Sequence, residues 1–185
     1  MRVCIISFSS RANGNCAAIS EFVKTCYGDS AEVYRFSDFS VRPCGECDYE
    51  CFGPERGCPA SGDRENVLLE AVIECDLAYF VVPNYCDYPC ANYFAFNERG
   101  QYYFSEHPDR MADYERTAKK FIVVSNTEKE NFRKAFSYQS KGAPDILFLR
   151  AADFGKVSIA GDLLASTQAK AAVAGFVSKP PFGPR

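Results

Sequence analysis

Short apolar runs rich in valine, isoleucine, phenylalanine and tyrosine recur along the chain. Between them, Asn15 to Cys26 and Asp63 to Glu74 carry apolar residues at helical spacing. Near-continuous apolar strands separated by helices are typical of a parallel sheet that is covered on both faces. The pattern therefore predicts an α/β fold with a doubly wound, five-stranded parallel sheet. The predicted strands are Val3 to Phe8, Glu32 to Phe36, Leu77 to Val82, Phe121 to Val124 and Ile146 to Leu149.

Two longer segments fit this repeat poorly. Arg42 to Gly62 is rich in cysteine, glycine and proline, and Tyr93 to Tyr114 is rich in aromatic and charged residues. Long irregular segments in a compact domain usually carry function or form interfaces. A last helix is predicted from Asp162 to about Val177. We therefore predict one domain over residues 1–178, with a cysteine-rich insertion at 42–62 and a proline-rich tail at 179–185.

Composition narrows the classes of partner. With 185 residues, 47% hydrophobic and 24% charged, the chain can bury one full core. Its formal net charge of −3 gives no long-range attraction for phosphate backbones or anionic lipid, so we expect neither nucleic acid nor membranes as partners. The N-terminal apolar run is too short for a secretion signal, and no apolar stretch approaches the ~20 residues of a membrane helix. We expect a cytoplasmic protein.

The predicted first strand leads into a polar turn, and a helix follows at once. Such a turn gathers backbone N–H groups, hydroxyls, a guanidinium and a helix N-terminus, which together suit an anion. The alternative is a plain strand-to-helix turn that is capped by Asn13 or Asn15. The candidate anion-binding residues are Ser9, Arg11, Asn13, Gly14, Asn15 and Cys16.

The predicted third strand ends in a proline followed by tyrosines, and a helix is expected from Ala91 to Arg99. Aromatic residues here can form the wall that a flat ring system needs, although they can also simply pack on their neighbours. We expect both loops to line one crevice at the switch point of such a sheet. The candidates in this loop are Pro83, Asn84, Tyr85, Cys86, Asp87 and Tyr88.

Both loops resemble those of the NADPH-dependent FMN reductase and iron–sulfur flavoprotein families. The phosphate loop of these families reads Gly-Ser-Pro-Arg, two or three residues, then Gly-Asn-Thr/Ser. This chain matches it at Ser9, Arg11, Gly14 and Asn15, and departs from it at Phe8, Ser10 and Cys16. Pro83 and Tyr85 match the loop that lies against the isoalloxazine ring in these families. A third flavin loop of the families reads Thr-Gly-Gly, whereas this chain has Ser125-Asn126-Thr127-Glu128, where Asn126 is the candidate contact.

Four of the ten cysteines form a compact array of the form C-x2-C-x3-C-x6-C. A [4Fe–4S] cluster, tetrahedral zinc and structural or redox thiols all remain open, since the first three would also share one face of a short helix. Iron–sulfur flavoproteins carry a similar array at this place, with one residue fewer in the second gap. Elsewhere, we expect Cys4, Cys26 and Cys75 in the core and Cys86 and Cys90 beside the flavin loop. The candidate metal ligands are Cys44, Cys47, Cys51 and Cys58.

The resemblance implies a flavodoxin-like fold of strand order 2-1-3-4-5, non-covalently bound FMN, and a homodimer or larger homo-oligomer. It implies hydride transfer from NADH or NADPH to flavin, and on to a small-molecule acceptor such as a quinone or flavin, or to a redox partner protein. The alternative is a flavin-containing electron carrier without a nicotinamide substrate. The only histidine, His107, lies in a turn-like polar stretch, and we assign no catalytic side chain, because the flavin carries the chemistry.

Overall fold

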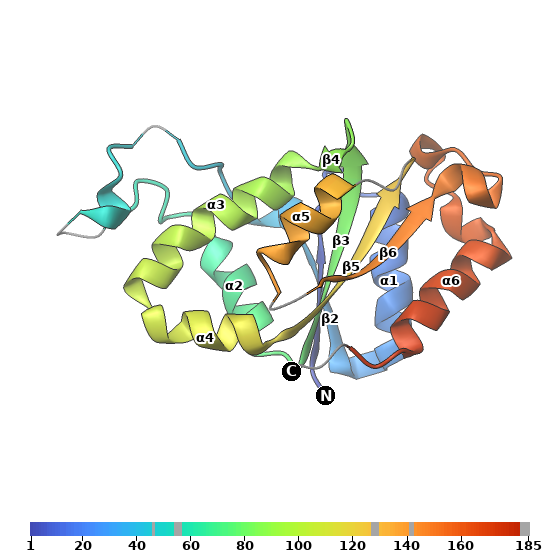
Figure 1. The fold of residues 1–185 in the computed structure, drawn as a ribbon, viewed down its shortest axis with the longest axis horizontal. Helices are drawn as coiled ribbons and strands as arrows, with labels where there is room; N and C mark the ends of the chain where they lie inside the picture. Colours follow the sequence, from blue (N-terminus) through green and yellow to red (C-terminus); the bar gives the residue numbers. More distant parts are fainter. Residues whose placement is uncertain (46, 54–56, 127–129, 141–142, 182–185) are drawn as a thin grey trace.

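A computed structural model describes residues 1–45, 47–53, 57–126, 130–140 and 143–181. A parallel sheet runs through its centre (Figure 1). The strand order is β2-β1-β3-β5-β6, which is the predicted 2-1-3-4-5, and so the flavodoxin-like topology is confirmed. A short strand, β4 (Tyr88–Pro89), pairs antiparallel with the end of β3. The parallel strands are β1 (Val3–Ser7), β2 (Ala31–Arg35), β3 (Leu77–Tyr85), β5 (Ala118–Ser125) and β6 (Asp145–Arg150).

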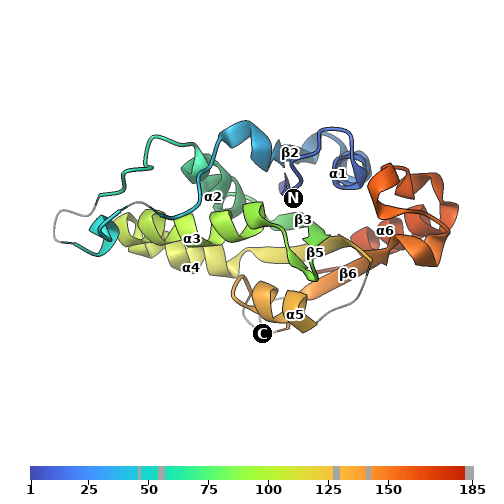
Figure 2. The same cartoon turned by 90° about the horizontal axis from the view of Figure 1, so that it is seen from above.

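Helices cover both faces of the sheet (Figures 1 and 2). One face carries α1 (Asn15–Tyr27) and α6 (Thr167–Ser178). Because side chains alternate along a strand, Val3 and Ile5 pack toward these helices while Cys4 and Ile6 pack toward the other face. This two-sided packing explains why every residue of β1 is buried. The second face carries α2 (Glu65–Ile73), α3 (Ala91–Glu106), α4 (Pro108–Arg116) and α5 (Glu130–Ser137).

The description of Tyr93 to Tyr114 as an irregular segment was wrong, because it belongs to α3 and α4, and the helix expected from Ala91 to Arg99 forms the first part of α3. Tyr93, Phe96 and Tyr103 are buried together on the inner side of α3. Proline begins α4, where its missing N–H would have no helical partner in any case. The aromatic residues that made the segment look irregular are therefore the core-facing residues of a helix.

Several other boundaries differ from the prediction. Neither β4 nor α5 was predicted, and α3 extends seven residues beyond the expected end at Arg99. The last helix begins at Thr167 rather than Asp162, since the Ser166 side chain caps it by accepting a hydrogen bond from the Ala169 N–H. Among the described helices, none is both long and apolar enough to cross a membrane.

The cysteine-rich segment after β2 is irregular, as expected, and extends away from the sheet beside α3 (Figures 1 and 2). Of its described residues, only Glu50–Phe52 form a short 3₁₀ turn. The helix that would have placed Cys44, Cys47 and Cys51 on one face is therefore not formed in the described part of this segment.

Candidate functional site

A cleft of about 440 Å³ opens at the carboxyl ends of β1, β3 and β5, which form the upper edge of the sheet in Figure 1. The structure brings the two candidate loops together around this cleft. Among the thirteen candidate flavin-binding residues, all of which the structure describes, only Asn13 and Tyr88 do not line the cleft. The lining residues are Ser9, Arg11, Gly14, Asn15, Cys16, Pro83, Asn84, Tyr85, Cys86, Asp87, Val124, Asn126, Ser158 and Ile159.

One end of the cleft is formed by the N-terminus of α1. Gly14 is the N-cap, with extended backbone angles, and no described side chain caps the helix. The alternative of a cap by Asn13 or Asn15 was therefore wrong. The Ser9 hydroxyl accepts a hydrogen bond from the Arg11 N–H at 3.1 Å, which shapes the turn. An open helix N-terminus beside an arginine is a site that favours a phosphate.

Gly14 allows a close approach within this turn. A Cβ at this position would lie 3.3 Å from the Arg11 Cβ, tighter than ordinary contact. The absence of a side chain at Gly14 thus lets Arg11 fold over the start of the helix. Asn13, by contrast, is exposed and does not line the cleft. Its carbonyl oxygen would lie 3.3 Å from a Cβ at Gly161.

Phe8 explains one departure from the family pattern, in which glycine stands at this position. Its ring is fully buried and packs against Phe36, Phe80, Tyr93 and Phe96 at centroid distances of 5.5 to 5.6 Å. Its carbonyl oxygen accepts a hydrogen bond from the Asn92 amide at 2.8 Å. The same amide donates to the Ser10 hydroxyl at 3.0 Å. Phe8 therefore anchors the turn from inside the core, while α3 holds it from the side.

Asn15 ties the helix N-terminus to a distant part of the chain. Its amide group donates to the Ser158 carbonyl at 2.7 Å, and its oxygen accepts from the Leu163 N–H at 2.9 Å. The side chain is only 5% exposed. These bonds hold in place the turn that carries Ser158 and Ile159, a part of the cleft wall that no sequence pattern indicated.

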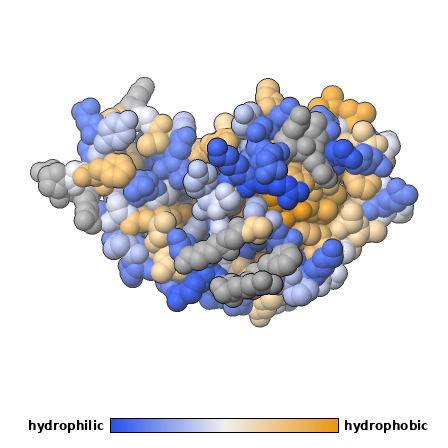
Figure 3. Space-filling view, viewed as in Figure 1, coloured by the Kyte–Doolittle hydropathy of each residue, from blue (hydrophilic) through white to orange (hydrophobic). Residues whose placement is uncertain are grey.

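Figure 3 shows an apolar surface at the top of the molecule over this turn between β6 and α6. Val157 and Ile159 are 62% and 74% exposed there. Ile159 also lines the cleft, so the apolar surface continues into it. Exposed aliphatic side chains at the rim of a cleft are suited to contact a flat apolar ligand.

The opposite wall is the tight turn between β3 and β4. Cys86 and Asp87 both have positive φ, 52° and 65°, as a two-residue hairpin turn that follows the twist of its strands requires. The Asn84 side chain accepts a hydrogen bond from the Asp87 N–H at 3.0 Å, and the Asn131 amide of α5 donates to the Asp87 carbonyl at 3.1 Å. This turn is therefore held rigid by both of its neighbours.

The remaining candidates around this wall differ in exposure. Tyr85 is 53% exposed and lines the cleft, whereas Tyr88 is 52% exposed outside the lining. Cys86 is exposed in the cleft, but Cys90 is buried, and its thiol donates to the Phe8 carbonyl. Asn126 lies at the end of β5 in the lining, and the neighbouring Thr127 and Glu128 lie outside the described residues.

Cys16 stands where the families carry a hydroxyl residue. It is 3% exposed, and burial raises the pKa of its thiol far above the ordinary value, with Cys90 adding to the rise and Arg11 opposing it. The thiol therefore stays protonated at neutral pH. An S–H group is a weak hydrogen-bond donor, so most of the polar contacts for a phosphate must come from backbone N–H groups, Ser9 and Arg11.

The four-cysteine array does not form a metal centre in this structure. Cys44, Cys47 and Cys58 line a separate cavity of about 450 Å³, and Cys51 lies outside its lining. Within the described residues, no three cysteine, histidine, aspartate or glutamate side chains are placed to share a metal ion. All ten cysteines are free thiols. Of the alternatives for the four cysteines, the structure gives no support to a cluster or to zinc, because the mostly irregular segment does not bring three of the described thiols within reach of one ion.

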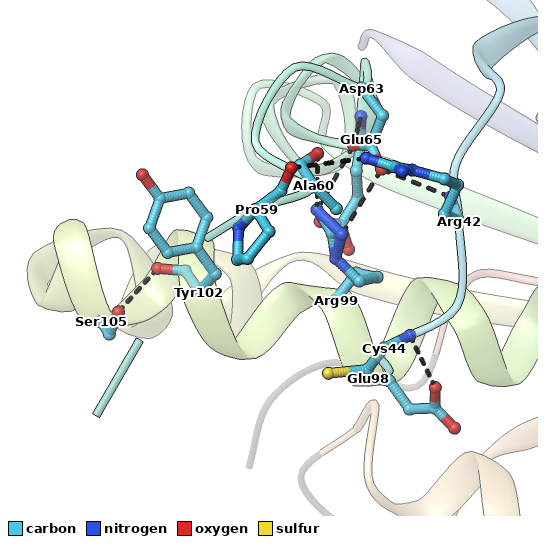
Figure 4. Close-up of polar contacts among 10 residues, drawn as sticks. All are labelled: Arg42, Cys44, Pro59, Ala60, Asp63, Glu65, Glu98, Arg99, Tyr102 and Ser105. Atoms are coloured by element: carbon cyan, nitrogen blue, oxygen red, sulfur yellow. Dashed lines mark hydrogen bonds and ion pairs between the residues drawn. The ribbon is translucent and has the colours of Figure 1, made fainter. Parts of the chain in front are cut away.

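A buried ionic cluster anchors this segment to α3 (Figure 4). Arg99 is 3% exposed, lies 3.4 Å from Asp63, and donates to the Ala60 carbonyl at 3.2 Å. Glu65 is 3.9 Å from the same guanidinium, yet burial raises its pKa to about 8. The Cys44 N–H donates to the Glu98 carboxylate at 3.2 Å. Glu98 and Arg99 thus hold this segment against α3.

Comparison with known proteins gives the fold a context. No protein-family profile matches the sequence, and no curated protein matches it. By structure, the chain is similar to Trp repressor binding protein from Bacillus subtilis, with a TM-score of 0.66 and 15% identity over 97% of this chain and 99% of that one. It is also similar to RosB with a bound intermediate, 8-demethyl-8-formylriboflavin-5′-phosphate, with a TM-score of 0.64 and 12% identity over 97% and 77% of the two chains.

A third similar structure is the flavoenzyme NAD(P)H:acceptor oxidoreductase FerB from Paracoccus denitrificans. Its TM-score is 0.52 at 11% identity, over 95% of this chain and 94% of that one. At such identities the likeness shows the fold alone, which is flavodoxin-like. The chemistry must be argued from the cleft.

Proposed function

We propose that this protein binds FMN in the cleft at the carboxyl ends of β1, β3 and β5 and acts as an NAD(P)H-dependent oxidoreductase. One observation carries the proposal: an uncapped helix N-terminus with Arg11 and a rigid turn with Tyr85 line the same 440 Å³ cleft. The first suits a phosphate and the second a flat ring, and the volume falls within the ~300–1,000 Å³ of ligand sites.

The residues present fit this cofactor. Ser9, Arg11 and the first N–H groups of α1 would hold the phosphate, while Pro83 and Tyr85 would form the wall against the isoalloxazine ring. The backbone of the turn after β3 would meet the polar edge of the ring. RosB, of similar fold, binds a riboflavin 5′-phosphate derivative, which supports a ligand of this class.

Bound FMN would accept a hydride from NADH or NADPH and pass electrons to an acceptor such as a quinone or a flavin. The role of this chain is to position and shield the ring. Tyr85 and Ile159 leave one side of the cleft open and apolar, where a nicotinamide or an acceptor can stack. A second copy of the chain covering this rim would account for the homo-oligomer that the family resemblance implies. No electron transfer is assigned to the four-cysteine segment.

Anaerobic rapid mixing distinguishes the proposed reductase function from that of an electron carrier. FMN-loaded protein should lose its flavin absorbance on mixing with NADPH or NADH, and should reoxidise when a quinone is added. Stable FMN binding without bleaching by either nucleotide would contradict the reductase and favour the carrier. Failure to bind FMN at all would contradict both.

A further inference from the structure

A third cavity lies at the opposite edge of the sheet, where β1, β2 and β3 begin. Its volume is about 230 Å³, and two cysteines from different elements line it. Cys4 lies in β1 and is 2% exposed, whereas Cys75 lies in the turn between α2 and β3 and is partly exposed. The expectation that Cys75 lies in the core was therefore wrong. The expectation for Cys26 was wrong too, since Cys26 is exposed on α1.

Both thiols line this cavity, and Cys75 packs against the core cluster that contains Cys4. The Cys75 thiol donates a hydrogen bond to the Val72 carbonyl at 3.2 Å. The pairing of Val3 with Leu77 in the sheet brings the turn beside the start of β1 and fixes this proximity.

The surroundings of the pair distinguish its two members. A hydrogen bond from Cys4 lowers the pKa of Cys75. Burial opposes this effect, whereas the N–H groups of Cys4 and Leu77 and the charge of Lys119 add to it. The same hydrogen bond, together with burial, raises the pKa of Cys4 well above its ordinary value. Cys75, which is partly exposed, is thus the member of the pair that a solute can reach, and Cys4, at 2% exposure, is its buried neighbour.

We propose that Cys4 and Cys75 form a redox-active thiol pair that a hydroperoxide converts to an intramolecular disulfide. A partly exposed, activated cysteine beside a second thiol is the arrangement of oxidation-sensitive protein sites. The cavity gives a small peroxide access to Cys75. The pair lies at the edge of the sheet opposite the flavin cleft and needs no flavin.

The chemistry balances in two steps. The Cys75 thiolate attacks the terminal oxygen of the hydroperoxide, the O–O bond breaks, and the alkoxide or hydroxide leaves and takes a proton from water. Cys75 is then a sulfenic acid. The Cys4 sulfur attacks the Cys75 sulfur, the S–O bond breaks, and hydroxide leaves with the Cys4 proton as water. In total, two thiols lose two electrons to one peroxide, and a dithiol reductant restores them.

Peptide mapping tests the pair. Reduced protein is treated with one equivalent of hydrogen peroxide, the remaining thiols are alkylated in denaturant so that buried cysteines also react, and the digest is analysed by mass spectrometry without reduction. We expect the Cys4 and Cys75 peptides joined and lighter by two hydrogen atoms, with both thiols lost in parallel. Cys26, an exposed thiol on α1, serves as the internal control and should remain at least about tenfold more alkylated than Cys75.

Two variants assign the roles. Cys75→Ser, in the partly exposed turn, should leave Cys4 fully alkylated after peroxide. Cys4→Ala should leave Cys75 as a sulfenic acid that dimedone captures. If Cys4→Ala does not fold, Cys75→Ser and the wild-type map decide alone. Absence of the joined peptides while Cys26 oxidises, or unchanged Cys4 loss in Cys75→Ser, would overturn the proposal.

Discussion

Arg11 is the single charged side chain in the turn between β1 and α1, and it lines the cleft. A guanidinium forms charge-assisted hydrogen bonds with phosphate. We expect Arg11→Ala to weaken FMN binding by about tenfold, or ~1.4 kcal/mol, in a fluorescence-quenching titration. Arg2→Ala, which removes an equal charge at the opposite edge of the sheet, is the control and should leave the affinity unchanged. An equal loss in both variants would show that only net charge matters.

The variant Asn15→Ala tests whether the turn at Ser158 contributes to the FMN site. The substitution removes two hydrogen bonds and leaves the Ser158 carbonyl and the Leu163 N–H without that partner. We expect Asn15→Ala to lower the free energy of unfolding by about 1–3 kcal/mol and to weaken FMN binding.

The matched control for this variant is Asn13→Ala, two residues away and exposed outside the cleft. Its unfolding free energy should change by less than about 0.5 kcal/mol. Denaturant unfolding and FMN titration of the two variants side by side give the comparison. Similar losses in Asn13→Ala would mean that the turn, rather than the Asn15 side chain, determines the stability.

At the scale of elements, Glu65 couples α2 to α3. It is buried 3.9 Å from Arg99, and burial, opposed by Arg99, raises its pKa to about 8. The ordinary value in an unfolded chain is about 4.3, so the folded protein binds this proton more tightly. The resulting stabilisation is complete below about pH 4 and is lost as the pH rises toward 8.

We therefore expect the free energy of unfolding to fall between about pH 5 and pH 8, by at least on the order of 1 kcal/mol. Glu65→Gln keeps the shape of the side chain but cannot ionise, so this fall should largely disappear. Denaturant unfolding across the pH range gives the measurement, and Glu74→Gln, an exposed carboxyl at the end of α2, gives the control. Parallel pH profiles for the wild type and Glu65→Gln would contradict the assignment.

Elements with continuous burial were predictable, and elements that depend on distant contacts were not. The strands β1, β3 and β5 are buried on both faces, so their apolar runs identify them, whereas their order in the sheet was implied by the family resemblance. The turn at Ser158 is joined to the cleft by a hydrogen bond from Asn15, 143 positions earlier in the chain. No local pattern encodes such a contact. Cysteine spacing likewise fixes no geometry when the segment between the thiols is irregular.

At the scale of the whole molecule, the two edges of the sheet carry different chemistry. The carboxyl edge gathers the polar turn, the rigid hairpin turn and the apolar rim, whereas the amino edge carries the Cys4 and Cys75 pair. A parallel sheet places loops at a common edge because all its strands point the same way. The position of the candidate FMN site thus follows from topology, and its affinity depends on the residues of the two loops.

Parallel titration of the wild-type protein with FMN and with riboflavin tests the central claim most directly. The two ligands share the ring and differ by the phosphate. The ratio of their affinities therefore measures how much the site at the start of α1 contributes to binding. We predict that FMN binds at least about tenfold more tightly than riboflavin, and that increasing salt reduces this ratio. Equal affinities, or no binding of either ligand, would contradict an FMN site built on this turn.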